Sequence, residues 1–179
     1  PAEVEACVAE TGLRPVELLA DRGVLGPRFV AVHATELLAH EARLLGEADA
    51  RVCLCPTTER DLGDGLPDLG ALVDAGVALC TGIDSHVITN PLEDLRCVEL
   101  GERSRTKRRV VLPPGEHATP AERLWHIGSR SGDRACGFDD DGGALEIDAA
   151  HPELALVPRD RLLDAVVYAA SPAVLRPRQ

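Results

Sequence analysis

Three short apolar runs, each followed by a segment with helical periodicity, constrain the fold of this chain more than any other feature. The runs are residues 28–35, 50–56 and 77–84, and the helical segments that follow them are 35–49, 66–76 and 90–106. The runs are continuously apolar rather than alternating, which is typical of parallel strands covered on both faces. Repeated strand–helix units build either a doubly wound sheet or a closed barrel, so the sequence predicts an α/β fold.

Cap and stop residues sharpen this assignment at both ends of the chain. Asn90 followed by Pro91 predicts the start of a helix, and Thr35 is a plausible N-cap for the segment 35–49. Further helices are predicted over 3–11, 15–23, 120–137 and 159–171, with short extended runs over 138–157. The segment "PTTERDLGDG", residues 56–65, is expected to be the loop after the second strand.

Polar side chains follow each predicted strand. His33 ends the first, residues 56–65 follow the second, and Asp84 and His86 end the third. Because the carboxyl ends of parallel strands meet at one edge of a sheet, we expect these groups to lie close together. A carboxylate beside imidazoles suits a divalent metal with a bound water, although a lone Asp in such a place is more often a helix cap or a loop carboxylate.

The predicted metal site is incomplete within this sequence. Asp84 could ligate zinc and take the proton of its water, whose pKa zinc lowers to about 7. His33 could bind the attacking water or the developing oxyanion. A catalytic zinc needs about three protein ligands, however, and these residues supply only part of that set. The other histidines are expected to be solvated: His40, His117, His126 and His151.

Composition excludes several classes of partner. The 19 basic and 30 acidic residues leave a net charge of −11, which argues against nucleic acid binding, and the basic run 103–109 is expected to be a solvated helix end. No stretch reaches about 18 apolar residues, so no membrane span or membrane partner is expected.

The six cysteines predict reduced thiols in a cytoplasmic protein, with Cys53 and Cys55 on opposite faces of their strand. There is no Met and the chain opens with Pro, so we expect a segment of a longer protein.

Two stretches resemble a known family. "FVAVHAT" and "RVCLCPTTERDLGDGLPDLGALVDAGVALCTGIDSHVITNPLEDLR" are similar to the second half of the barrel in the amidohydrolase superfamily, and most similar to the formimidoylglutamate deiminase family. The most specific piece is "CPTTERDLGDG", because nucleobase deaminases tend to carry a Pro-Ser-Asn type sequence there. The resemblance implies the C-terminal part, strands six to eight, of a (β/α)8 TIM-type barrel over 1–112. It implies a helix and join over 113–137 and part of a small β-sandwich over 138–179.

The resemblance also implies residue roles. His33 would assist hydrolysis, and Asp84 would ligate one Zn²⁺ and shuttle the proton. His86, Thr57, Thr58 and Glu59 would contact the substrate. The implied reaction is the zinc-dependent hydrolysis of N-formimino-L-glutamate to N-formyl-L-glutamate and ammonia, in histidine degradation. The partner is then a small-molecule substrate, and the whole protein is expected to be a homodimer.

The sequence differs from the family pattern at several positions, and two alternative functions are weighed against this hypothesis. The family's H-x-H pair and a further metal-binding His are absent, and Ile83 stands where Ser is usual. An aminohydrolase of the same superfamily acting on a nucleobase or related amidine is one alternative. A non-enzymatic doubly wound binding module is another, but it predicts a glycine-rich loop after the first strand, where "VHATELL" has none. Three strands also leave two open edges, so this segment alone is expected to be marginally stable, to associate and to bind zinc weakly.

Overall fold

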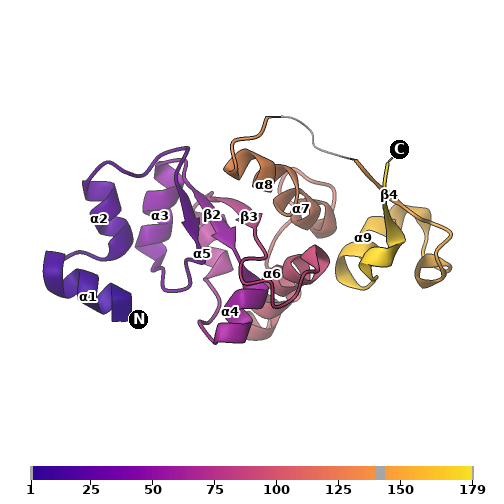
Figure 1. Cartoon of the computed structure of the whole chain (residues 1–179), viewed down its shortest axis with the longest axis horizontal. Coiled ribbons are helices and arrows are strands. Elements are labelled where there is room, and N and C mark those ends of the chain that lie inside the picture. Colours follow the sequence, from indigo (N-terminus) through magenta and orange to yellow (C-terminus); the bar gives the residue numbers. More distant parts are fainter. Residues whose placement is uncertain (1, 140–143, 179) are drawn as a thin grey trace.

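A parallel three-stranded sheet forms the centre of the chain in a computed structural model, which describes residues 2–139 and 144–178 (Figure 1). The strands are β1 (Val30–Val32), β2 (Arg51–Leu54) and β3 (Ala78–Thr81), and they lie in the order β1-β2-β3. Both pairings are parallel, with Val32 opposite Cys53 and Cys53 opposite Cys80. The predicted α/β class and the parallel direction of all three strands are confirmed.

Helices surround this sheet and extend to both ends of the molecule. The helices α1 and α2 lie at one end of the long axis, and the segment that carries α9 and β4 lies at the other (Figure 1). The helices are α1 (Ala2–Thr11), α2 (Pro15–Asp21), α3 (Ala39–Glu47), α4 (Pro56–Leu62), α5 (Leu69–Asp74), α6 (Pro91–Thr106), α7 (Pro120–Ile127), α8 (Arg130–Ala135) and α9 (Leu162–Tyr168). Within the described residues, none of them is long and apolar enough to cross a membrane.

One face of the sheet carries the main core. Val52 and Leu54 of β2 are fully buried and pack in one cluster with Leu45 of α3, Leu72 of α5 and Leu124 of α7. The neighbouring positions on β2 point to the opposite face and are only half-buried. Val32 of β1 is 53% exposed on that side. The expectation that all three strands are covered on both faces is therefore wrong for this part of the sheet, because apolar character alone does not specify what covers each face.

Helix α6 begins where its capping residues predict. The Asn90 side chain accepts a hydrogen bond from the backbone N–H of Leu92 at 3.1 Å, and Pro91 occupies the first helical position. The basic run 103–109 begins in the last turn of α6 and continues past its end at Thr106, and Arg103 pairs with Glu99 at 2.7 Å. Local capping chemistry was sufficient to place this helix.

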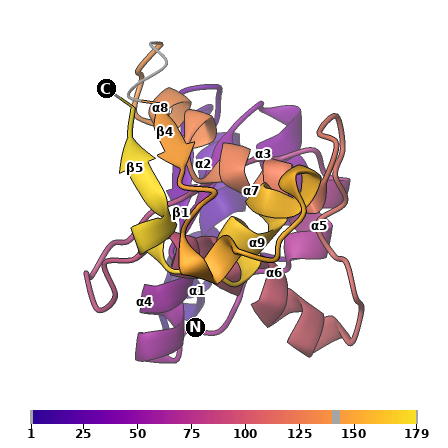
Figure 2. The same ribbon diagram turned by 90° about the vertical axis from the view of Figure 1, so that its right-hand side faces the viewer.

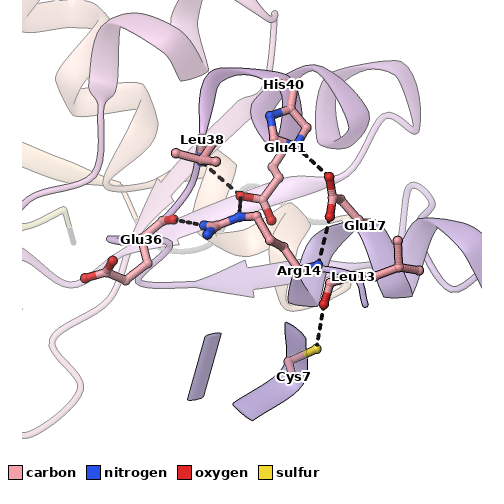
Figure 3. A network of polar contacts seen from close by, with 8 residues as sticks. All are labelled: Cys7, Leu13, Arg14, Glu17, Glu36, Leu38, His40 and Glu41. Atoms are coloured by element: carbon pink, nitrogen blue, oxygen red, sulfur yellow. Dashed lines mark hydrogen bonds and ion pairs between the residues drawn. The ribbon is translucent and has the colours of Figure 1, made fainter. Parts of the chain in front are cut away.

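The N-cap of helix α3 is Leu38, three residues later than the predicted Thr35, and a tertiary contact holds this start in place (Figure 3). The buried Glu41 carboxylate accepts hydrogen bonds from Leu38 N at 3.0 Å and from Arg14 Nε at 2.8 Å. The Arg14 guanidinium also bonds the carbonyl of Glu36. An arginine from the preceding helical segment thus holds residues 36–38 outside the helix.

Two other predictions are corrected at their boundaries. Residues 56–62 are not a loop but helix α4, with Pro56 at its first position and Gly63 ending it at φ +73°. The predicted helix 120–137 is two helices, α7 and α8, separated at Gly128. A Cβ at Gly128 would lie 2.6 Å from the Leu95 Cδ2 atom, so glycine allows α7 to end in close contact with α6.

The C-terminal segment contains a small antiparallel pair of strands, β4 (Leu145–Ile147) and β5 (Leu175–Pro177), which Figure 2 shows side by side. Three short 3-10 turns and α9 lie between them: η1 (Pro152–Leu154), η2 (Arg159–Arg161) and η3 (Pro172–Val174). Val166 and Val174 pack with Leu95 of α6 in a second cluster. The β-sandwich over 138–179 stays a prediction, and its residues 140–143 and 179 lie outside the described residues.

Candidate active site

The ends of the three parallel strands bring one imidazole between two carboxylates. His33 follows β1, Glu59 lies in α4 directly after β2, and Asp84 follows β3. The Nδ1 atom of His33 is 3.4 Å from Glu59 Oε1, and its Nε2 atom is 3.8 Å from Asp84 Oδ2. The predicted meeting of His33 and Asp84 at one edge of the sheet is therefore present in the structure.

The backbone at this edge is in an unusual conformation. His33, Asp84 and His86 have φ values of 68°, 56° and 56°, in the left-handed region that non-glycine residues rarely adopt. Such conformations cost about 1–3 kcal/mol each and cluster at functional sites. Two backbone hydrogen bonds of 2.9 Å hold the turns in place, from His33 N to Cys53 O and from Gly82 N to Leu54 O. The strand ends are thus built to present these side chains.

Glu59 is a buried acid. Its exposed fraction is 1%, and its Oε1 atom accepts a hydrogen bond from the backbone N–H of Cys55 at 2.9 Å. Burial raises the pKa of Glu59, while the Cys55 N–H and the nearby His33 oppose that rise. A titratable group perturbed by burial beside a specific charge partner is typical of functional sites.

Thr57 and Thr58 act on neighbouring elements through their hydroxyl groups. Thr57 donates to Asp94 Oδ1 of α6 through both its hydroxyl at 2.9 Å and its backbone N–H at 3.2 Å. Thr58 donates to the carbonyl of Ile83 at 3.1 Å and accepts from Ser85 N at 3.2 Å, so it holds the turn that carries Asp84. Both threonines are at most 2% exposed. These contacts support a positioning role, and substrate contact by either residue stays a prediction.

Asp94, the acceptor of both Thr57 hydrogen bonds, is a buried acid that the sequence does not indicate. It is 1% exposed, and its Oδ2 atom has no hydrogen-bond partner within the described chain. Burial raises its pKa, and the two hydrogen bonds from Thr57 lower it. In the sequence, an acid in the first turn of a helix is an ordinary favourable interaction with the helix dipole, which gave no signal of burial.

His86 follows Asp84 by two residues but has no polar contact with the described residues. Its side chain is exposed. Its predicted contact with the substrate therefore has no support from a neighbouring protein group and stays a prediction.

Three thiols lie on the same side of the sheet next to His33, those of Cys53, Cys55 and Cys80. Cys53 and Cys55 are both within 3.5 Å of the position a Cβ at Gly82 would occupy, so the prediction that they face opposite sides is wrong. Residues two apart on a strand share a face. Contacts from the thiols of Cys55 and Cys80 lower the pKa of Cys53, and the pKa values of those two donors are raised. All six cysteines are free thiols.

An open pocket of about 550 Å³ adjoins His33. This volume is within the range of small-molecule sites, roughly 300–1,000 Å³. Its polar lining is mostly acidic, with Glu36, Glu41 and Asp64 around the single guanidinium of Arg14. That guanidinium is already paired with Glu41.

The described residues do not form a complete metal site. No group of three His, Cys, Asp or Glu side chains within 2–139 and 144–178 is arranged to hold a metal ion. Asp84 and His33 offer two donor atoms 3.8 Å apart, whereas a catalytic zinc takes three protein ligands. The residues seen here therefore fit at most part of a metal centre.

Comparison with known proteins gives one family. Residues 1–150 match the amidohydrolase family. The chain is 30% identical to a formimidoylglutamate deiminase of Pseudomonas aeruginosa over 97% of its length, and 32% identical to a 5-methylthioadenosine/S-adenosylhomocysteine deaminase of Halobacterium salinarum over 88%. These alignments cover 40% and 35% of the two relatives.

Solved structures agree with this result. A zinc-bound adenosine deaminase of Xanthomonas campestris superposes with a TM-score of 0.83 at 25% identity, over 97% of this chain and 40% of that one. An amidohydrolase of Brucella melitensis gives a TM-score of 0.82 at 28% identity, over 98% of this chain and 40% of that one. The chain thus spans about 40% of the length of the proteins it resembles.

Proposed function

Because the chain belongs to the amidohydrolase family, we propose that it carries part of the active site of a deaminase that hydrolyses N-formimino-L-glutamate. The products are N-formyl-L-glutamate and ammonia. The relatives from Pseudomonas aeruginosa and Halobacterium salinarum are a deiminase and a deaminase, which supports hydrolysis of a C–N bond. We further propose that 1–112 forms strands six to eight of a (β/α)8 barrel, and that the working protein is a cytoplasmic homodimer.

The observation that carries this proposal is the position of His33 between Glu59 and Asp84 at the strand ends. In the proposed reaction Asp84 accepts the proton of the attacking water and returns it to the departing nitrogen. His33 lies 3.8 Å from Asp84, where its Nε2 atom can hold the water or the tetrahedral centre in line. Zinc, when bound, would supply a water of lowered pKa. Asp84 is the one ligand we assign to it in this chain.

The charge around His33 favours the formimino group as the reacting end of the substrate. A formimino group is an amidine, which carries a positive charge near neutral pH, and the carboxylates of Glu59 and Asp84 lie on both sides of the His33 ring. Asp64 adds a further acid to the adjoining pocket. Adenine is neutral at the same pH, so it gains less from this arrangement.

A second candidate is an adenosine-type deaminase. It is supported by the 32% identity to the deaminase of Halobacterium salinarum and by the 27% identity to a 5′-deoxyadenosine deaminase of Methanothrix thermoacetophila. Both candidates release ammonia by hydrolysis of a C–N bond. The ammonia comes from the formimino nitrogen in the first candidate and from the amino group of the adenine ring in the second.

Ammonia release distinguishes these candidates. The protein, produced with all the polypeptide its gene encodes, is incubated with formiminoglutamate and separately with 5′-deoxyadenosine, 5-methylthioadenosine, adenosine, guanine and cytosine. We expect turnover of formiminoglutamate, loss of turnover in Asp84→Asn, and normal turnover in the control Asp61→Asn, whose exposed side chain lies on α4. Turnover of a nucleoside or nucleobase alone would replace the proposed substrate, and no ammonia from any of them would reject the proposed function.

A further inference from the structure

Glu59 is buried beside His33 with part of its carboxylate unused. Its Oε2 atom and the Nδ1 atom of His33 are both buried and both lack a hydrogen-bond partner within the described residues. Oε1, which accepts from Cys55 N, is 3.4 Å from that Nδ1 atom. Burying a carboxylate without compensating partners is costly, so this placement calls for a second interaction besides the one with Cys55.

Closing the first turn of α4 does not explain why residue 59 is an acid. The hydrogen bond from Cys55 N needs only one acceptor oxygen, which a glutamine amide would provide equally well. The neighbouring imidazole of His33, in contrast, does depend on the chemistry of residue 59. A group that can only accept a hydrogen bond favours the tautomer whose proton is on the ring nitrogen that faces it. A carboxylate can only accept, whereas a glutamine side chain can also donate.

The His33 ring is held so that its two nitrogens face different groups. Its backbone N–H is bonded to Cys53 O at 2.9 Å and its φ is 68°, which restricts how the side chain leaves the turn. Nδ1 faces the buried carboxylate of Glu59 at 3.4 Å, whereas Nε2 faces Asp84 at 3.8 Å. The Asp84 side chain is 44% exposed, so water screens its effect on the ring more than it screens the effect of Glu59. In a neutral imidazole one nitrogen donates and the other accepts, and the partner of one nitrogen fixes the state of the other.

We propose that Glu59 is a positioning residue that acts through His33: its buried carboxylate holds the proton on Nδ1 and leaves Nε2 as an acceptor facing Asp84. The tautomer stands on the geometry alone, whereas its effect on rate rests on the proposed function. Glu59 then needs no contact with the substrate, which differs from the role that the family resemblance implied for it.

The tautomer is measured directly by long-range ¹H–¹⁵N correlation of the histidine rings in the protein produced with all the polypeptide its gene encodes. The pH is set where the rings are neutral, and a His33→Gln variant identifies the His33 signals. We expect the proton on Nδ1 in the wild type and a mixture, or a proton on Nε2, in Glu59→Gln. The control Glu99→Gln replaces another fully buried carboxylate, one that accepts hydrogen bonds from Val111 N and Leu112 N, and should leave the His33 signals unchanged.

The kinetic consequence follows from the same variants. We expect kcat to fall about 100-fold in Glu59→Gln, the size of loss that misplacing a group at the reacting centre can cause, with KM changed little. Glu59→Asp keeps the charge and should recover part of this loss. Thermal unfolding of Glu59→Gln and Glu99→Gln separates general destabilisation from the specific effect.

Each outcome decides the inference. A wild-type His33 with its proton on Nε2 overturns it, whether or not any variant folds. An unchanged tautomer and unchanged kcat in Glu59→Gln also overturn it. If Glu59→Gln does not fold, the wild-type tautomer and Glu59→Asp decide. A wild type that releases no ammonia from any tested substrate rejects the proposed function but leaves the tautomer measurement valid.

Discussion

The link between Thr57 and Asp94 gives the sharpest stability test, because it joins a buried charge to the helix that carries Glu59. Thr57→Val keeps the shape of the side chain and removes the 2.9 Å hydrogen bond from the hydroxyl to Asp94 Oδ1. Only the 3.2 Å bond from Thr57 N then remains on a carboxylate that is 1% exposed. Loss of a hydrogen bond to a buried charged group costs about 1.5–3 kcal/mol, against about 0.5–1.5 kcal/mol for a neutral one.

The cost of Thr57→Val should therefore depend on pH. Burial raises the pKa of folded Asp94 above its unfolded value, so the folded state binds more protons between these two values and stability falls as pH rises through that window. The Thr57 hydroxyl lowers this pKa, and its removal raises the pKa further and widens the window. The loss in free energy of unfolding should accordingly be about 0.5–1.5 kcal/mol at pH values below this window and about 1.5–3 kcal/mol at pH values above it.

Urea denaturation followed by circular dichroism at several pH values measures this difference. In an Asp94→Asn background the group cannot ionise, so Thr57→Val should cost the same at every pH. An equal cost below and above the window in the Asp94 protein, or the same pH slope in the Asp94→Asn background, would show that ionisation of Asp94 does not set the cost.

Three further predictions concern packing, chemistry and metal binding. Gly46→Ala should lower the free energy of unfolding by about 1–3 kcal/mol in the same urea assay, because its Cβ would lie 2.1 Å from the Ala75 carbonyl oxygen between α3 and α5. Asp84→Asn should lower kcat by about 100-fold or more, as an ammonia-release assay would show. A melting curve of the zinc-free protein should change little, since the Asp84 side chain is 44% exposed. Calorimetric titration of zinc into residues 1–179 alone should give no tight binding, and a nanomolar Kd would contradict the partial metal site seen here.

Local sequence chemistry determined much of the architecture. The three apolar runs specified three parallel strands, and Asn90 with Pro91 specified the start of α6, because strand character and helix caps depend on residues close in the chain. The polar groups at the strand ends were also predictable, since parallel strands end at a common edge. His33 and Asp84 meet there, at 3.8 Å.

The tertiary structure decided what depends on residues distant in the chain. Arg14 and Glu41 delay the start of α3, and Thr57 contacts Asp94 across 37 positions, neither of which leaves a periodic signal. Glu59 appears in the sequence as one more acid in a polar segment, and only the fold buries it beside His33. The amino-acid sequence is enough to predict which chemical groups reach this edge of the sheet. The structure decided which atoms face one another there, because burial and orientation arise from contacts among all the packed elements.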